Sequence, residues 1–189
     1  TKDLDLWLDP SAENAVKVAR ALNEFGVPLI EITEADLAIE REIRTAALAR
    51  HPGIGLIGEE YGSTEARAIS LIVDPIDGTR AFMHGDSRWG VAIALVERGA
   101  PVLGIVHMPA RGETFAATRG GGAFRNDAPI RVSPRRHVEG SLIAGPRSTL
   151  EAMARAGVSF TTEPRIPSLA YRLARVAEGS LDAGIASTN

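Results

Sequence analysis

The sequence predicts a layered α+β fold built as a single domain, and three observations lead to this prediction. Segments with helix start and stop signals alternate irregularly with short apolar runs that suit strands. Two pairs of these runs are joined by tight turns, which makes part of the sheet antiparallel. The chain has 189 residues, of which 44% are hydrophobic and 24% are charged. This length and composition are typical of one globular domain with a sizeable core, which we expect over residues 1–189.

Start and stop signals place the helices. Asp9 as N-cap and Pro10 at the first helical position predict a helix that runs to about Phe25. A second helix begins near Thr33 and is ended by the His-Pro-Gly sequence at 51–53. Further helices are expected over residues 149–156 and 167–179.

Apolar runs place the strands. The runs "GIGLI" (53–57) and "AISLIVD" (68–74) are short and β-branched, which is typical of strands buried on both faces. Residues 89–109 predict a β-hairpin that turns at Arg98-Gly99-Ala100, and residues 113–133 predict a second hairpin through a glycine turn. The remaining strands are expected at 141–145 and 181–186.

Charge and composition exclude several classes of partner. The net charge is −3 and no segment carries a dense basic run, so we expect no nucleic-acid polymer as a partner. No apolar stretch has the length of a membrane span, and "TKDLDLWLDP" is not a signal peptide, so we expect no membrane partner. The absence of cysteine excludes disulfides, thiolate nucleophiles and Cys-ligated zinc, and it fits a cytoplasmic protein.

Two aspartates follow the apolar run 69–73 in the stretch "LIVDPIDGTRAF". Asp74 sits at the expected strand end, where Pro75 biases it away from the helical region. Gly78 permits a tight turn, after which a helix can begin at Thr79. This geometry directs the carboxyl groups of Asp74 and Asp77 and two backbone N–H groups toward one small volume. A divalent cation would relieve the repulsion between the two acids, and magnesium prefers such hard oxygen ligands.

An ordinary turn is the alternative interpretation, because Asp-Pro and Asp-Gly are common turn dipeptides. It does not explain why a second acidic pair, Glu59-Glu60, also follows a strand-like run that ends in Gly58. Alone, that pair would be typical of a solvated loop. Two strand ends that both present acids indicate a metal site built from oxygen ligands.

The motifs "GEE" at 58–60 and "DPIDGT" at 74–79 together resemble the inositol monophosphatase family of magnesium-dependent, lithium-sensitive phosphatases. The resemblance extends from "TEAD" at 33–36 to "GSLDAGIAS" at 179–187. It implies a layered α-β-α-β-α sandwich of the sugar/inositol phosphatase type with mixed sheets. It also implies hydrolysis of a small phosphate monoester, most simply inositol monophosphate, by metal-activated water. A homodimer is expected because members of the family commonly dimerise.

The resemblance also implies a set of metal ligands. Glu59, Asp74 and the backbone carbonyl of Ile76 would hold the first magnesium ion. Asp74 would bridge to a second ion, which Asp77 would also ligate, and two or three Mg²⁺ ions are expected in all. Such ions suit phosphate-ester hydrolysis because they orient water and neutralise charge on the attacking and leaving oxygens.

Further roles follow from the same resemblance. The N–H groups of Gly78 and Thr79 would bind the substrate phosphate at a helix N-terminus. Thr79, paired with Asp36, would position or deprotonate the water, with Glu59 beside them as a third catalytic residue. Asp77 would also contact substrate, as would the segment containing Ser168 and Ala170, mainly through its backbone.

Structural alternatives stand beside these roles. "TEAD" at 33–36 is also a helix-start pattern in which Asp36 serves the first turn. Ser168 is equally well interpreted as the N-cap of the helix that follows it. The glycines of "TRGGGAFRND" predict a hairpin turn, since no Gly-Lys-Ser/Thr sequence of a Walker-type loop occurs.

The sequence departs from the family in two places. The later Trp-Asp motif, whose aspartate completes the second metal site, is absent from these residues, which end at "STN". "VPLIEITEAD" lacks the lysine and the Ser-Pro-Val-Thr sequence that commonly precede the equivalent of Asp36. We therefore expect a single phosphatase domain that lacks the C-terminal part of the family fold. Alternative functions are a 3'(2'),5'-bisphosphate nucleotidase, a histidinol-phosphate phosphatase, or a non-catalytic member that binds metal or a partner.

Overall fold

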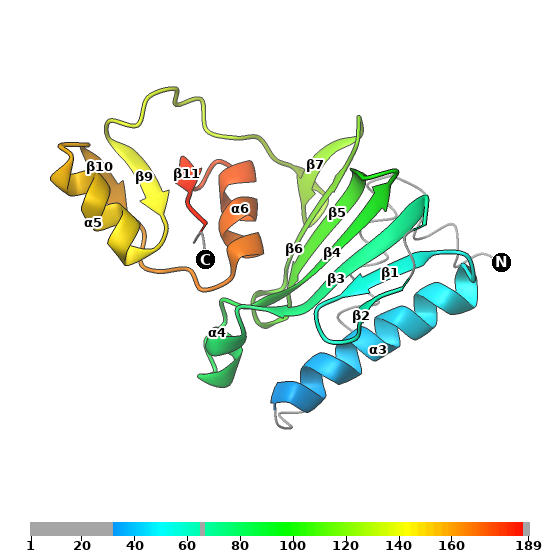
Figure 1. The fold of residues 1–189 in the computed structure, drawn as a ribbon. Coiled ribbons are helices and arrows are strands. Elements are labelled where there is room, and N and C mark those ends of the chain that lie inside the picture. The colour runs from blue at the N-terminus through cyan, green and yellow to red at the C-terminus, as the bar shows by residue number, and fades with distance from the viewer. Residues whose placement is uncertain (1–31, 65–66, 187–189) are drawn as a thin grey trace.

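Five layers stack in the computed structural model, which describes residues 32–64 and 67–186. Figure 1 shows helix α3 (Ile32–Arg50) against one face of a large sheet and helix α6 (Leu169–Ala177) on its other side. A small sheet follows, and helix α5 (Arg147–Arg155) covers its outer face. The arrangement confirms the predicted α-β-α-β-α sandwich with mixed sheets. The helix predicted from Pro10 to about Phe25 lies outside the described residues.

Within the described residues, the large sheet has eight strands in the order β2-β1-β3-β4-β5-β6-β7-β8. Only β1 and β3 pair in parallel, and every other neighbouring pair is antiparallel. Both predicted hairpins are present, as β4–β5 and β6–β7. The short helices α4 (Thr79–Met83) and η1 (Pro109–Arg111) follow β3 and β5. The strands are β1 (Gly55–Gly58), β2 (Gly62–Ser63), β3 (Ile69–Asp77), β4 (Gly90–Glu97), β5 (Ala100–Met108), β6 (Glu113–Thr118), β7 (Gly122–Arg125) and β8 (Ala128–Pro129).

The small sheet consists of three parallel strands, β9 (Ser141–Ala144), β10 (Phe160–Thr162) and β11 (Ala183–Gly184), in the order β10-β9-β11. Helix α5 connects β9 to β10, and α6 connects β10 to β11 from the opposite face (Figure 1). Parallel neighbours need such crossover helices because a tight turn cannot join them. The crossover from β10 to β11 therefore places α6 between the small sheet and the large sheet.

Helix α3 follows the prediction closely, since it ends at Arg50, directly before the His-Pro-Gly sequence at 51–53. Its buried apolar residues recur at four-residue intervals, which places them on one face of the helix. That face packs on Leu71, Val73 and Ile93 of the large sheet. The buried apolar residues of α3 are Ala35, Ile39, Ile43 and Ala47.

No helix in the described residues is both long and apolar enough to cross a membrane.

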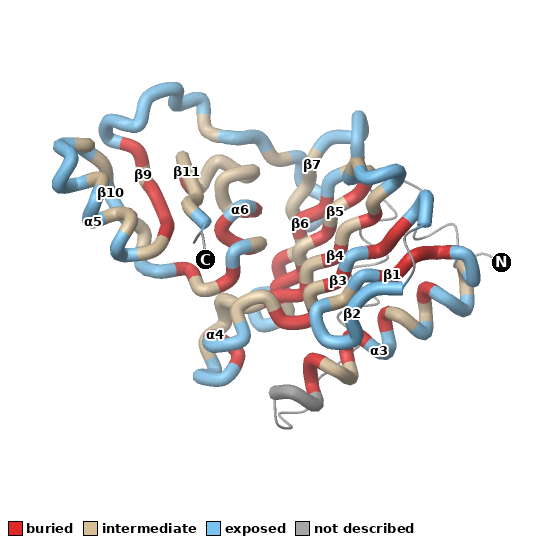
Figure 2. Tube along the Cα trace, viewed as in Figure 1, coloured by how far each residue is buried: buried red, intermediate tan, exposed pale blue. Residues whose placement is uncertain are grey.

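A second hydrophobic cluster fills the space between the two sheets. Met108 and Phe115 contribute from the large sheet, Tyr171 from α6, and Ile166 and Leu181 from the segments on either side of α6. The rings of Phe115 and Tyr171 lie 6.1 Å apart between centroids. Figure 2 shows buried residues in the middle strands of the large sheet, along β9 and at a few positions of α6. Because side chains alternate along a strand, β5 and β6 serve both clusters, one on each face.

Two details differ from the sequence prediction. Strands β1 and β3 were expected to be buried on both faces, which is wrong, because Ile57 and Ile72 are 41% and 38% exposed. Helix α6 packs against β4 and β5, and it leaves this part of the same sheet face open. The strand expected to end at Asp74 also continues to Asp77. Pro75 is tolerated inside it because the pairing with β4 is irregular at that point.

Candidate active site

An irregularity in β3 places Asp74 and Asp77 on the same side of the sheet. Asp74 pairs with Ala92 of β4 and Asp77 pairs with Gly90, so three steps along β3 match two along β4. Residues three apart on a regular strand point to opposite faces, and the extra residue of a β-bulge removes that difference. Pro75, which has no N–H to donate, lies inside the bulge. The sequence "DPID" thus directs two carboxyl groups into one volume, as predicted.

Asp74 lies in a crowded acidic environment. Its pKa is raised from 3.8 to about 7, mainly by burial and then by the charges of Asp77 and Glu59 and a hydrogen bond with Glu59, while a hydrogen bond with the Ile76 backbone lowers it. Its Oδ1 atom is buried and has no hydrogen-bond partner. The predicted metal ligands Glu59 and Asp77 therefore lie close enough to Asp74 to raise its pKa.

Asp36 joins this group from helix α3. Its side chain is buried, with 6% exposure, although it is an acid. Its pKa is raised to about 6, mainly by burial and then by the charges of Glu60 and Glu59. The first turns of α3, the β1–β2 turn and β3 therefore contribute acids to one site, from segments far apart in the sequence.

The carboxylate of Asp77 binds the N-terminus of helix α6. Ser168 donates its hydroxyl to Asp77 Oδ2 at 2.8 Å, and the backbone N–H of Ala170 donates to the same atom at 2.5 Å. The N–H of Leu169 donates to Oδ1 at 3.1 Å. Ser168 also accepts the N–H of Tyr171 at 2.9 Å, which confirms the predicted N-cap. The structure thus brings together Asp77, Ser168 and Ala170, all of which were predicted to contact substrate.

Gly78 and Thr79 form the turn that leads from β3 into α4. Gly78 has a φ of 96°, a left-handed conformation that favours glycine, and a Cβ there would lie 3.2 Å from the backbone N of Ser168. Thr79 donates its hydroxyl to the Ile76 carbonyl at 3.1 Å. No hydrogen bond joins Thr79 to Asp36 in the described part of the chain, so their predicted pairing stays a prediction. The N–H groups that begin α4 have no acceptor within the helix.

The donor set of the site fits a hard cation. It offers carboxyl oxygens and the carbonyl of Ile76, and one carboxyl oxygen of Asp74 is buried without a partner. Repulsion between Asp74, Asp77 and Glu59 is the situation that a divalent ion relieves. Within residues 32–64 and 67–186, however, no three His, Cys, Asp or Glu side chains are already arranged to hold an ion. The acids approach one another without forming a complete coordination shell.

Sequence reasoning missed Glu40, which is fully buried against the β1–β2 turn that contains Glu59 and Glu60. It lies on α3 four residues after Asp36, so both face the large sheet. Asp36 was already a candidate site residue. An acid one helical turn after it is the sequence signal that could have identified Glu40.

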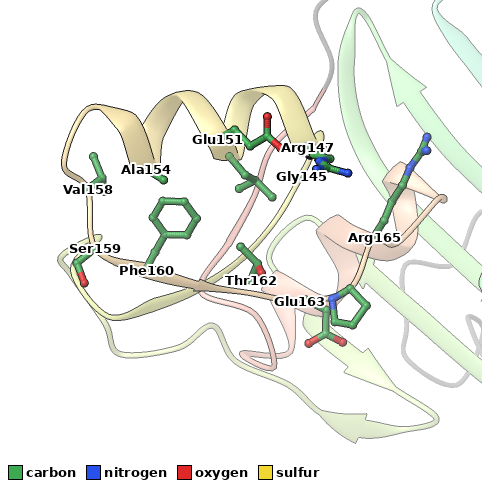
Figure 3. Close-up of a pocket in the computed structure, with 12 residues that line it drawn as sticks. Gly145, Arg147, Glu151, Ala154, Val158, Ser159, Phe160, Thr162, Glu163 and Arg165 are labelled. Atoms are coloured by element: carbon green, nitrogen blue, oxygen red, sulfur yellow. Dashed lines mark hydrogen bonds and ion pairs between the residues drawn. The ribbon is translucent and has the colours of Figure 1, made fainter.

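A separate pocket of about 580 Å³ lies between α5 and β10. Figure 3 shows the apolar side chains of Ala154, Val158 and Phe160 at one end and Arg147 and Glu163 near the other. None of the residues predicted to bind metal or substrate lines it.

Arg165, which lines the pocket, lies three residues before Ser168 in the chain. The carbonyl of Arg165 accepts a hydrogen bond from Arg88 Nη1 at 2.7 Å. The hydrolysis considered for the acidic residues does not use this pocket.

A five-layer sandwich with carboxyl groups gathered beside two helix N-termini defines the sugar- and inositol-phosphatase class of fold. The extragenic suppressor protein suhB from Bartonella henselae has the same fold, with a TM-score of 0.76 and 28% identity over 100% of this chain and 79% of that one. Residues 20–188 match the model of the inositol monophosphatase family. The chain therefore belongs to the inositol monophosphatase family.

Two curated relatives illustrate the range of names within the family. A histidinol-phosphatase of Chlorobaculum parvum is 42% identical over 143 residues, which cover 70% of this chain and 54% of that protein. An inositol-1-monophosphatase of Rhizobium meliloti is 37% identical over 118 residues, which cover 61% of this chain and 44% of that protein. The chain thus spans about half the length of the curated relatives that it matches.

Proposed function

We propose that this protein is a magnesium-dependent phosphatase of small phosphate monoesters, with inositol monophosphate as the simplest substrate. The observation that carries the proposal is the group of acids around Asp74. The pKa of Asp74 is raised to about 7 by burial and by Asp77 and Glu59, and one oxygen of Asp74 is buried without a hydrogen-bond partner. Such an arrangement is unfavourable in the absence of a cation and suits two or three Mg²⁺ ions.

In this proposal Glu59, Asp74, Asp77 and the Ile76 carbonyl hold the metal. Bound magnesium would supply positive charge that neutralises the phosphate and lowers the pKa of water. The chain's own residues orient the reactants. Asp36, whose pKa is raised to about 6, can accept a proton near neutral pH, which suits a general base beside Glu59.

Two helix N-termini bind and orient the substrate. The free N–H groups of Gly78 and Thr79 at the start of α4 are suited to phosphate oxygens, since a helix N-terminus favours anions. The start of α6 is tied to Asp77 through Ser168 and Ala170. Substrate bound at α4 therefore faces the α6 N-terminus, which we assign to the leaving group.

Histidinol phosphate is a second candidate substrate. Two relatives named histidinol-phosphatase, from Chlorobaculum parvum and Mycobacterium tuberculosis, are 42% and 39% identical to this chain. These identities support a substrate with an amino alcohol, and the phosphate and metal contacts proposed above apply equally to it.

The test is phosphate release from inositol monophosphate, histidinol phosphate and 3'-phosphoadenosine 5'-phosphate, with magnesium and with EDTA. We expect magnesium-dependent release from at least one of the three. Magnesium binding without release from any of them would support a non-catalytic member that binds metal or a partner. Release that is equally fast in EDTA would reject the metal assignment.

Three further properties complete the proposal. We propose a single phosphatase domain over residues 1–189, a cytoplasmic location and a homodimer. Light scattering coupled to size-exclusion chromatography tests the last of these, with a mass near twice 20.0 kDa expected for this chain.

A further inference from the structure

Glu40 is an acid with no solvent contact and a full set of polar partners. Its exposure is 0%, and it accepts the backbone N–H of Glu60 at 2.8 Å and that of Tyr61 at 3.3 Å. Arg44, one turn further along α3, donates Nη1 to Oε1 at 3.1 Å, the same oxygen that accepts the Tyr61 N–H, whereas Oε2 accepts the Glu60 N–H. A carboxylate can accept all three bonds because neither oxygen carries a hydrogen.

The chain at Gly58 passes directly against this carboxylate. A Cβ atom at Gly58 would lie 1.7 Å from Glu40 Oε1 and 2.2 Å from Cδ, so any side chain there would have to displace the buried carboxylate. Glycine is therefore required by the close approach of the strand to Glu40. Gly58 immediately precedes Glu59, so the contact with Glu40 lies next to a predicted metal ligand in the chain.

Arg44 holds the far side of the same turn. It donates Nη1 to the Gly62 carbonyl at 3.2 Å, and its guanidinium lies 5.7 Å from the centroid of the Tyr61 ring. Glu40 and Arg44, which we call the α3 clamp, therefore bind both ends of the β1–β2 turn. Asp36 lies one turn before Glu40 on the same helix and faces the charges of Glu59 and Glu60. One helix thus fixes both the turn and an acid beside it.

We propose that Glu40 is a positioning residue, whose buried carboxylate holds the β1–β2 turn so that Glu59 stays beside Asp74. This inference rests on the proposed function, because it assigns Glu40 to the arrangement of a metal ligand. A purely structural role would make Glu40 important for folding and leave magnesium affinity unchanged. The two roles are therefore separable by experiment.

The first experiment measures the turn itself and needs neither metal nor substrate. Glu40→Gln keeps the size of the side chain and replaces one acceptor oxygen with an NH₂ donor, so one backbone N–H of the turn loses its partner. We expect amide hydrogen exchange at Glu60 and Tyr61 to become roughly tenfold faster. Exchange in the β4–β5 hairpin should keep its wild-type rate. Unchanged exchange at Glu60 and Tyr61 would overturn the proposal.

The second experiment measures magnesium affinity by calorimetry and by the magnesium concentration that gives half-maximal phosphate release. Changing residues that support metal ligands typically weakens metal affinity or activity roughly 10- to 100-fold, and we expect Glu40→Gln to fall in this range. The matched control is Glu178→Gln, which removes a carboxylate of 9% exposure that pairs with Arg125 at 2.9 Å. Glu178 lies at the far end of α6, so its variant should keep wild-type magnesium affinity. Equal effects of the two variants would show a general loss of stability and reject positioning.

A third variant remains informative if Glu40→Gln folds poorly. Gly58→Ala should push the Glu40 carboxylate aside and reproduce the weakened magnesium affinity. In a Glu40→Ala background the same change has room, so most of its effect should disappear. Additive effects of the two changes would contradict direct contact as the cause.

Failure of the proposed function gives a different result. A wild-type protein that binds magnesium but releases no phosphate rejects the enzyme, and calorimetry still tests Glu40. An active wild type whose magnesium affinity is unchanged in Glu40→Gln rejects the positioning role alone.

Discussion

Asp77 links the large sheet to helix α6 through a single carboxylate. A β-bulge turns it toward Asp74, and three groups at the start of α6 donate hydrogen bonds to it. These hydrogen bonds fix the orientation of the Asp77 carboxyl group at the start of α6. The residue that was predicted to bind metal thus also fixes the position of α6.

Replacing Asp77 with asparagine tests this residue most directly. Asp77→Asn keeps one acceptor for α6 but removes the charge, so we expect magnesium-dependent phosphate release to fall by roughly 100-fold or more, beyond the loss seen for supporting residues. Asp127→Asn is the control, since Asp127 is an exposed turn residue with a φ of 69° that asparagine readily adopts. Activity retained in Asp77→Asn would remove this residue from the metal ligands.

The pH dependence of stability in EDTA tests the raised pKa values of Asp36 and Asp74. In the folded protein these values are about 6 and about 7, against 3.8 for an ordinary aspartate. Between pH 4 and 7 the folded state therefore binds protons that the unfolded state has released, so these two groups make the free energy of unfolding fall as pH rises through that window.

Urea denaturation in EDTA at pH 4, 5, 6 and 7 measures this slope. Asp74→Asn should show a smaller decrease than wild type, because one of the two groups is gone. Magnesium added at pH 7 should restore stability to the wild type, since the ion binds only the folded site. Identical pH profiles for wild type and Asp74→Asn would contradict the raised pKa.

Much of the site was predictable at the level of single residues, because the acids follow local signals. "GEE" and "DPIDGT" each stand near the end of an apolar run, and the structure brings their acids within electrostatic reach. Glu40 was missed because its partners, the N–H groups of Glu60 and Tyr61, are backbone groups about 20 residues away. No residue type in the turn indicates such a contact.

At the scale of elements, the start of α6 is the most informative feature. Ser168 caps the helix by accepting the Tyr171 N–H and also donates to Asp77, so one hydroxyl links helix formation to the acidic site. The alternatives raised from the sequence, a cap and a substrate contact, are therefore compatible. The cap is confirmed, and the substrate contact stays a prediction.

Ser168→Ala should destabilise the protein by about 1 kcal/mol, the usual effect of losing a serine N-cap. Urea denaturation measures the change, and Ser148→Ala, in the exposed first turn of α5, serves as control and should differ little from wild type. An effect no larger than that of the control would show that Asp77 alone holds the start of α6.

Helices and hairpins were predicted well because their signals are local. The end of α3 at Arg50 and the turn between β4 and β5 are both marked by glycine or proline. The strands β2, β8 and β10 were not predicted, since two or three residues are too few to show a period of two. They exist because neighbouring strands supply their hydrogen-bond partners.

At the scale of the whole molecule, β5 and β6 join the two hydrophobic clusters. Ile105 and Ala116 belong to the cluster that includes the apolar face of α3, while Met108 and Phe115 belong to the cluster that includes α6. The clusters lie on opposite faces of the same strands, so one cannot be disrupted without loosening the backbone that supports the other. The alternation along β5 and β6 is visible in the sequence, whereas the burial of both faces depends on helices that come from distant segments.

A substitution in the second cluster should therefore weaken the whole fold in one step. Met108 has 0% exposure, and Met108→Ala should cost about 2–5 kcal/mol by leaving a cavity between the sheets. We expect urea transitions followed by far-UV and near-UV circular dichroism to shift together and remain coincident, because both clusters share β5 and β6. Leu48→Ala, at an exposed position on α3, is the control and should shift neither transition appreciably. Two separate transitions in Met108→Ala would show that the layers on either side of the large sheet unfold independently.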